Sequence, residues 1–378
     1  MKKYFSMFMV LALFVGLLAG CGSAQTSGAN KSDSGKAGKG NFVIGFANGY
    51  IGNTWRSQFV DNVKAQGEKL KQQGVIKDIK IANSNADVSK QLTQLNQMIS
   101  EGVNALMIDP VSADSLGPIV AKAKAKGILV VITNDPAAYE GTYSVIGNND
   151  AFWRIQAKWL ANKLNNKGNI VQINGLPGNT ADTFRRQAAK EVLGKTDIKV
   201  LAEAPGKWDE SEAQKVTSTF LSTYNNIDGI LTQDVMAEGI LRAFDTAGKK
   251  PPVMTGDYTY SFLRTWAKTP DLDSIAVPYA PGVGVDALNI TVQLLQGKKF
   301  NDSVLQANPL NTKLKNALLV DPPYVVTKTA QPNAPWMEGL KFTKAISVDD
   351  AVKIGEGKPG TAALDAGMTD DQIKSFFK

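Results

Sequence analysis

Short apolar runs alternate with amphipathic stretches along most of this chain, and this rhythm constrains its fold more than any other feature. The run 42–46 is apolar apart from one glycine, which is typical of a strand buried on both faces of a sheet. Residues 54–73 have the length of a helix, and 88–99 carry apolar side chains at helical spacing behind a suitable N-cap, Asp87. The other runs predicted as strands are 79–81, 105–108, 128–132, 143–146, 169–173, 198–201, 229–231 and 253–254. This spacing predicts βαβ units, and the pattern starts afresh after the middle strand, so we expect an α/β fold with two doubly wound parallel-sheet lobes.

The first residues, 1–20, have the composition of an export signal. Lys2 and Lys3 give a positive start, and the run 7–18 is apolar apart from one glycine. A permanent membrane helix is the alternative, but a spanning helix needs about 20 apolar residues and this run is shorter. We therefore expect residues 1–20 to be a signal peptide.

The single cysteine, Cys21, directly follows Leu18-Ala19-Gly20. This tetrad resembles the lipobox of bacterial lipoproteins, whose cysteine carries diacylglycerol and becomes the new N-terminus. Residues 21–40 are mostly Gly, Ser, Ala, Lys and Asn, a composition that cannot bury surface and predicts a flexible tether. The resemblance implies an extracytoplasmic protein anchored to the cell membrane by lipidated Cys21. The alternative is a chance cysteine behind an ordinary signal peptide.

The composition excludes several classes of function. With no His and one Cys, the chain can form no Ser-His-Asp triad, no His-ligated metal site and no disulfide framework. The formal net charge of +7 has no dense basic run, which is typical of a solvated surface rather than a nucleic-acid interface. Neither the dinucleotide motif GxGxxG nor a P-loop is matched, and we expect no cofactor.

Polar and aromatic side chains gather where the predicted strands end. In open parallel sheets, ligands bind beyond the carboxyl ends of the strands, so these residues are the candidate binding site. Carboxylates and amides suit sugar hydroxyls, which both donate and accept hydrogen bonds, while aromatic rings pack on the apolar faces of a sugar. The candidates of this kind are Asn53, Trp55, Arg56, Asn134, Asp135, Trp208, Gln233 and Asp257, with Tyr279 near a predicted chain crossover.

Four of the candidates also have a purely structural alternative. Asp135 and Asp257 can each cap the helix that follows. Trp55 and Trp208 can belong to the core, although Arg56 beside Trp55 favours a partly polar setting. The residues alone leave these alternatives open.

Several of these segments occur in an order that matches one family. In chain order they are Asn53-Thr54-Trp55-Arg56, Ile108-Asp109-Pro110, Thr133-Asn134-Asp135, Gly178 with Arg185 and Arg186, Trp208, Gln233-Asp234-Val235-Met236-Ala237-Glu238-Gly239 and Gly256-Asp257. Through them the stretch 42–296 resembles the type I periplasmic sugar-binding proteins of ABC importers, typified by the ribose-, galactose- and galactofuranose-binding proteins. There are departures: Pro136 stands where many members have Arg, Gln233 replaces the usual Asn, and the binding Arg aligns only loosely, with Arg185 preferred to Arg186.

The resemblance implies two lobes that trap a sugar when they close about a hinge. Lobe 1 is then expected at 41–147 plus 279–307, and lobe 2 at 148–278 plus 308–330. The segment 331–378 breaks the strand–helix rhythm and is expected to be a partly ordered C-terminal extension, whose role the sequence does not reveal.

The function that the resemblance implies is capture of a monosaccharide (pentose, hexose or furanose) or a polyol for an ABC permease and its ATPase subunits. We expect a monomer that binds its ligand without altering it. Asp135, Asp257, Arg56 and Gln233 are expected to hydrogen-bond hydroxyls, with Asn53, Asn134, Arg185 and Tyr279 as further contacts and Trp55 and Trp208 on the two faces of the ring. Two alternatives remain: a signal receptor of the same fold that binds an autoinducer or a nucleoside, and a glycosidase with paired carboxylates.

Overall fold

The computed structural model describes residues 40–378. The predicted signal peptide, the lipidated Cys21 and the tether up to residue 39 lie outside the described residues. Within 40–378, none of the helices combines the length and the apolar character that a membrane span requires.

The first sheet contains most of the strands predicted for the first half of the chain. Its strand order is β11-β12-β5-β4-β3-β1-β2, and all neighbours are parallel except β11 and β12, which pair antiparallel. The strands are β1 (Val43–Asn48), β2 (Asp78–Asn83), β3 (Ala105–Ile108), β4 (Leu129–Thr133), β5 (Tyr143–Gly147), β11 (Gln306–Asn308) and β12 (Asn311–Val320).

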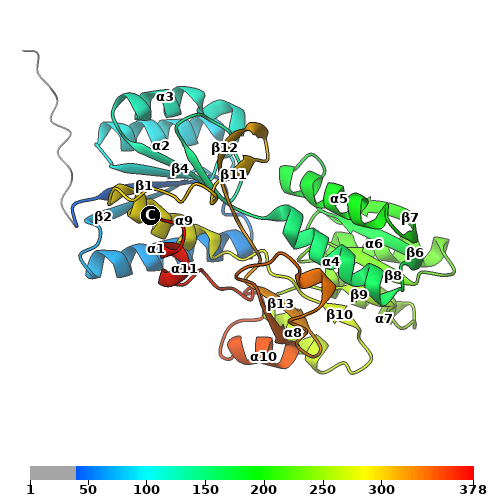
Figure 1. Ribbon diagram of the computed structural model, residues 1–378. Coiled ribbons are helices and arrows are strands. Elements are labelled where there is room, and N and C mark those ends of the chain that lie inside the picture. The colour runs from blue at the N-terminus through cyan, green and yellow to red at the C-terminus, as the bar shows by residue number, and fades with distance from the viewer. Residues whose placement is uncertain (1–39) are drawn as a thin grey trace, which may run out of the picture. The chain divides into compact units, whose positions relative to one another are not determined.

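Helices cover both faces of this sheet, as Figure 1 shows. They are α1 (Thr54–Gln72) and α9 (Val283–Leu295) on one face, and α2 (Val88–Ser100) and α3 (Gly117–Ala125), preceded by the short helix η1 (Ala113–Leu116), on the other. Phe46 and Phe59 lie in the core beneath α1 and α9, while Leu106 and Ile119 lie in the core beneath α2 and α3. Burial on both faces explains why the central strands read as continuous apolar runs.

The second sheet is parallel throughout, in the order β10-β9-β8-β6-β7. Its strands are β6 (Lys167–Asn174), β7 (Asp197–Pro205), β8 (Gly229–Thr232), β9 (Val253–Thr255) and β10 (Ser274–Ile275). Its helices are α4 (Asn149–Lys163), α5 (Thr180–Leu193), α6 (Glu210–Thr223), α7 (Ala237–Thr246) and α8 (Tyr260–Ala267). Helix α4 packs on α5 and α6 packs on α7, and Trp153, Trp159 and Trp266 are fully buried in the core between these helices and the sheet.

The chain passes from the first sheet to the second after β5 and returns after β10, as the expected hinge requires. One sheet assignment was wrong. Residues 308–320 were expected in lobe 2, but Ala317–Val320 pair with Ser144–Gly147 at the edge of the first sheet. The reason is that β5 leaves its far edge unpaired, and β12 satisfies the backbone groups there.

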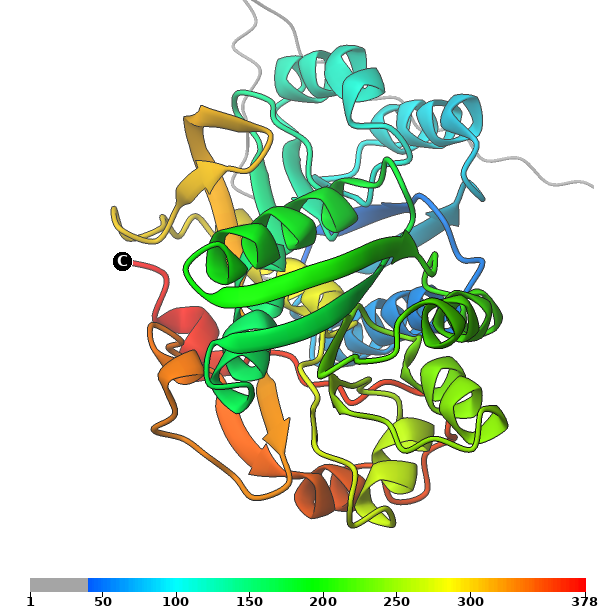
Figure 2. The ribbon, with the colours of Figure 1, turned by 90° about the vertical axis from the view of Figure 1, so that its right-hand side faces the viewer.

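The C-terminal extension is ordered rather than partly ordered. It contains the short helix η2 (Pro335–Met337), β14 (Lys344–Ser347), α10 (Val348–Ile354) and α11 (Asp370–Lys374), and β14 pairs in parallel with β13 (Tyr324–Thr327). Figure 2 shows this two-stranded sheet beside α10. The extension packs because it carries large apolar side chains: Trp336 and Leu364 join the core around the second sheet, while Ile373 and Phe376 join the core beneath α1 and α9.

Hydrogen bonds attach the extension to elements of both sheets. The backbone N–H of Leu364 donates to the carbonyl of Tyr258 after β9 (2.7 Å), and Asn62 of α1 donates to the Asp365 carboxylate (2.5 Å). Asp286 of α9 accepts the backbone N–H of Met368 (2.7 Å). The composition of this segment signals loops, but its side chains determine where those loops lie.

Candidate functional site

A cavity of about 310 Å³ lies beyond the carboxyl ends of β1, β4, β6 and β8. All but two of the predicted ligand residues line it: Asn53, Trp55, Arg56, Asn134, Asp135, Arg185, Trp208 and Tyr279. The remaining lining residues are Tyr50, Leu176, Asn179, Ala181, Lys207, Asp234 and Val235. Both sheets therefore contribute side chains to one cavity, at the edge that the rule for parallel sheets predicts.

The two exceptions, Gln233 and Asp257, lie behind the cavity wall. Gln233 is fully buried, accepts the indole N–H of Trp208 (3.0 Å) and donates to Asp182 (2.7 Å). Asp257 is buried and accepts backbone N–H groups of Val235, Tyr258 and Thr259. Neither side chain lines this cavity. At the first position the neighbouring residue, Asp234, faces the cavity instead, because successive side chains of an extended backbone point in opposite directions.

Arg56 organises the wall formed by the first sheet. Its two terminal nitrogens each contact a carboxylate oxygen at 2.7 Å, one on Asp109 and one on Asp135. Asn134 donates its amide to the other oxygen of Asp109 (3.1 Å). Asp109 is fully buried, whereas the side chain of Asp135 is 30% exposed, so Asp135 is the carboxylate that a ligand can reach.

Burial and charge act in opposite directions on this wall. Burial disfavours the charge on Arg56, but the carboxylates of Asp109 and Asp135 hold the pKa of Arg56 above its ordinary value. Burial raises the pKa of Asp109 above its ordinary value, although Arg56 opposes this. Arg56 thus stays charged and fixes the direction of the Asp135 carboxylate.

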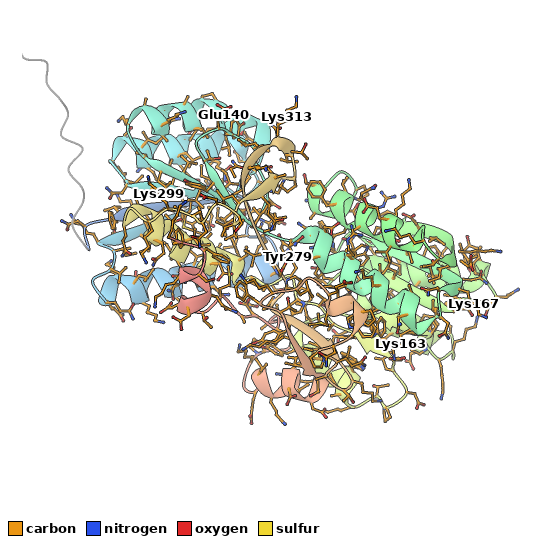
Figure 3. The ribbon with its side chains drawn as sticks, viewed as in Figure 1. Glu140, Lys163, Lys167, Tyr279, Lys299 and Lys313 are labelled. Carbon is orange, nitrogen blue, oxygen red and sulfur yellow. The ribbon has the colours of Figure 1, made fainter. Side chains whose placement is uncertain are left out.

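Two aromatic rings form the floor beside Arg56. The indole N–H of Trp55 donates to the backbone carbonyl of Tyr279 (2.7 Å), and its ring stacks on Phe59 at 5.5 Å with an interplanar angle of 12°. Tyr279, labelled in Figure 3, comes from the segment between β10 and α9 and lies 5.7 Å from Trp55, ring centre to ring centre. Burial raises the pKa of Tyr279 well above its ordinary value.

Arg185 organises the wall formed by the second sheet. Its side chain is 4% exposed and contacts Asp234 at 2.7 Å, while its Nε donates to Asn149 at 2.9 Å. The guanidinium lies over the rings of Phe152 (4.3 Å) and Tyr279 (5.0 Å). Of the two adjacent arginines only Arg185 lines the cavity, since Arg186 is exposed and pairs with Glu203 on the surface.

Trp208 is held in place by a chain of hydrogen bonds through Gln233 to Asp182, which also accepts the backbone N–H of Gly175 (2.8 Å). Gly175 is required here, since a Cβ at that position would lie 2.3 Å from the Trp208 ring. The side-chain amide of Gln233, the residue that replaces Asn in the family motif, therefore orients the indole of Trp208.

Four of the eight non-glycine residues with positive φ in residues 40–378 line the cavity. Asn134, Lys207, Trp208 and Val235 all line it and all have φ between 57° and 64°. This region is unfavourable for residues other than glycine and most of all for β-branched Val235. Strain of about 1–3 kcal/mol per residue persists where a functional geometry requires it.

The sequence reasoning missed several residues that build the site. Asp109 and Asp234 each form an ion pair with a cavity arginine, and both follow predicted strands, so their position was a usable signal. Asn149 carried no such signal, because it lies in the first turn of α4 and contacts Arg185 only through the tertiary fold. Among residues 40–378, no group of three or more His, Cys, Asp or Glu side chains is placed to hold a metal ion.

Comparison with known proteins places this geometry in context. Residues 44–299 match a family model described as periplasmic binding protein domain. A xylitol-binding protein of Mycolicibacterium smegmatis is 33% identical over 259 residues, which cover 66% of this chain and 68% of that protein. The ribose import binding protein of Bacillus subtilis is 27% identical over 316 residues, 83% of this chain and 100% of that protein.

Solved structures show the same fold. An ABC transporter solute binding protein from Thermobispora bispora aligns with a TM-score of 0.62 and 22% identity, covering 85% of this chain and 98% of its own. An ABC transporter solute binding protein from Bacillus halodurans, crystallised with bound myo-inositol, aligns with a TM-score of 0.61 and 23% identity over 75% of this chain and 93% of its own.

Proposed function

Because the chain belongs to the periplasmic binding protein domain family, we propose that it is an extracytoplasmic solute-binding protein that captures a monosaccharide or a polyol for an ABC importer. The relatives that it matches are named as binding proteins for xylitol and ribose. As such a protein it binds its ligand and releases it unaltered.

The charge balance of the cavity is the observation that carries the choice of ligand class. Arg56 is paired with Asp135 and Arg185 with Asp234, each at 2.7 Å. The remaining cavity cation, Lys207, lies 3.7 Å from Glu212. A charged ligand would have to break one of these pairs, whereas an uncharged polyhydroxyl compound can use their remaining donors and acceptors.

The proposed ligand contacts follow from exposure. Asp135, whose side chain is 30% exposed, offers a carboxylate oxygen to a hydroxyl, and a hydrogen bond to a charged group contributes roughly 1.5–3 kcal/mol. Trp55 and Trp208, from opposite walls, offer ring faces to the C–H face of a sugar. Gln233 and Asp257 act from behind, by orienting Trp208 and the Asp234–Val235 turn.

The proposal includes the place of the protein in the cell. Cys21, in its lipobox-like tetrad, is lipidated and holds a monomeric binding protein at the outer side of the cytoplasmic membrane, where the permease collects the ligand. Replacement of Cys21 by Ser should release the protein from membranes into the soluble fraction. Mass spectrometry of the N-terminal peptide should then lack the diacylglycerol that the unsubstituted protein carries.

A thermal-shift panel tests the ligand class. Ribose, allose, xylitol, myo-inositol and arabinose are added separately, and we expect at least one to raise the melting temperature, with calorimetry giving its affinity. Asp135→Ala should weaken that affinity at least about tenfold, because one charged hydrogen bond is lost. Asp350→Ala is the matched control, since this carboxylate lies on the surface of α10. Recovery of a chemically altered sugar, or binding only of charged compounds, would refute the proposal.

A further inference from the structure

Two loops at the cavity share one sequence pattern. Residues 48–54 read Asn-Gly-Tyr-Ile-Gly-Asn-Thr and residues 174–180 read Asn-Gly-Leu-Pro-Gly-Asn-Thr. The first follows β1 of the first sheet and the second follows β6 of the second sheet. In each loop the second Asn caps the next helix: Asn53 accepts the backbone N–H of Arg56 and Asn179 that of Ala181, both at 2.8 Å. The loops thus occupy corresponding positions on the two walls, although their backbones differ: Gly178 has a positive φ of 82° and Gly52 does not.

The third residue of each loop is a large apolar side chain left in solvent. Tyr50 is 42% exposed and Leu176 is 47% exposed, although most apolar side chains of this size in residues 40–378 are buried. Both line the sugar cavity, one from each wall. Exposed apolar area carries a cost of roughly 25 cal/mol per Å², which a contact between the two side chains would recover.

Both side chains are presented by fixed backbone rather than by free loops. The Asn48 side chain donates to the carbonyl of Tyr50 (2.9 Å), and a Cβ on Gly52 would lie 1.9 Å from the Tyr50 hydroxyl, so the ring packs where that glycine has no side chain. Across the cavity, the backbone N–H of Asn179 donates to the carbonyl of Leu176 (3.1 Å). Such anchoring lowers the entropy lost when the two side chains meet.

We propose that Tyr50 and Leu176 form an apolar gate, contacting each other across the cavity mouth when the two walls close on a ligand. This inference rests on the proposed function and adds a positioning role to it. The gate excludes water from the polar groups below, which strengthens their hydrogen bonds to the ligand. It also has to separate before the ligand can leave, so it sets the rate of release.

The gate makes a kinetic prediction that a merely structural role does not. Tyr50→Ala and Leu176→Ala should each raise koff of the bound sugar about 3–10-fold with little change in kon, because the contact exists only in the closed complex. The double variant should be no worse than either single variant, since each removes the same contact. Leu310→Ala, at an equally exposed apolar side chain outside the cavity, should leave both rates unchanged.

Disulfide trapping tests the contact directly. Tyr50→Cys and Leu176→Cys are combined in a full-length chain that carries Cys21→Ser, so that the pair holds the only thiols. Tyr50→Cys with Leu310→Cys is the control pair. Each protein is oxidised mildly with and without ribose or xylitol, and cross-linking is followed by mass spectrometry.

The gate pair should cross-link faster than the control pair, and faster still with whichever of the two compounds raises the melting temperature. Cross-linking no faster than the control overturns the gate, and leaves the proposed function intact if a compound binds. If neither compound binds, the cross-linking rates of the gate pair and the control pair without added compound still test the gate. In that case ribose and xylitol are excluded as ligands.

Discussion

The two cavity loops, 48–54 and 174–180, have nearly the same sequence and the same cap, yet they support different chemistry. Two positions after the shared Thr stands Arg56 in one loop and Asp182 in the other. Arg56 lines the cavity and bridges the buried Asp109 and the partly exposed Asp135, whereas Asp182 is buried and accepts hydrogen bonds from Gly175 and Gln233. In the second wall the guanidinium comes from further along the helix, at Arg185.

The comparison shows that the shared loop sequence does not determine which charged side chains the following helix contributes to the site. Both loops place a helix N-terminus and an exposed apolar side chain at the cavity. The cation sits closer to solvent in the first wall, where the Arg56 side chain is 17% exposed, than in the second, where Arg185 is 4% exposed. The two walls should therefore respond differently to loss of their arginine.

Arg185→Ala should have the largest effect. It leaves the Asp234 carboxylate buried without its cation, which costs about 3–5 kcal/mol of folding free energy. Urea unfolding measures this loss, and calorimetry should find sugar affinity reduced at least a hundredfold. Arg186→Ala is the matched control, because its pair with Glu203 is exposed and should contribute less than about 1 kcal/mol. Equal effects of the two variants would contradict the second-wall assignment.

Arg56→Ala should cost less, about 2–3 kcal/mol, because water reaches Asp135 and Asp109 can take up a proton. The folded-state pKa of Asp109 is already raised by burial, and removal of Arg56 raises it further. Stability of the variant should therefore fall more steeply than that of the original protein as the pH rises through the weakly acidic range. Unfolding by urea at several pH values checks this, and a loss independent of pH would show that Asp109 stays charged.

Asp257→Asn sharpens the comparison, because this carboxyl lies behind the second wall with no cation beside it. Burial raises the pKa of Asp257 to about 7. A carboxyl whose pKa is raised on folding contributes stability that is present below about pH 4 and is lost as the pH rises through about 7. We expect the amide variant to lose this slope, so that its stability relative to the original protein rises between pH 4 and pH 8. Asp350→Asn should change the stability in the opposite sense. The Ser347 hydroxyl lowers the pKa of Asp350, so the original carboxylate contributes stability above about pH 4 that its amide variant lacks.

The smallest effects are expected at the caps that the two loops share. Asn53→Ala and Asn179→Ala each remove one hydrogen bond to a helix N-terminus, at a cost of about 1 kcal/mol. Thermal unfolding should show losses of this size for both, because each variant removes one side-chain hydrogen bond to a backbone N–H in the first helical turn. A loss well above this value at either position would mean that the Asn side chain contributes more than its capping hydrogen bond, and Ser347→Ala at the cap of α10 gives the reference value.

Much of the fold followed from the sequence, because parallel strands buried on both faces read as apolar runs and the helices between them carry recognisable caps. Asn53, Asp87 and Asn179 all cap helices. The assignment of 308–320 failed because β12 is placed by edge pairing with β5, which leaves no mark in its own residues. The prediction of a partly ordered extension was wrong for a similar reason. Its Pro and Gly content indicated loops, and the packing of Trp336 and Phe376 against distant elements leaves no local pattern.

The candidate site was predictable in outline for the same reason. Parallel strands end at one edge, so side chains after β1, β4 and β8 had to gather there. Which of two neighbours enters the cavity could not be predicted, because it depends on backbone twist, as at Gln233 and Asp234 beside the strained Val235. The partners of Arg185 could not be predicted either, since Asn149 and Asp234 are brought to it from separate elements.

By itself the sequence determined the α/β architecture, the edge where polar side chains collect and the exclusion of His-dependent sites and of a disulfide framework. These follow from periodicity and composition, which are local properties of the chain. Only the tertiary structure decided that Arg56 bridges Asp109 and Asp135, that Asp257 is buried behind the wall, and that the extension packs against elements of both sheets. Such contacts join residues far apart in sequence, and their energy depends on burial and distance, which exist only once the chain has folded.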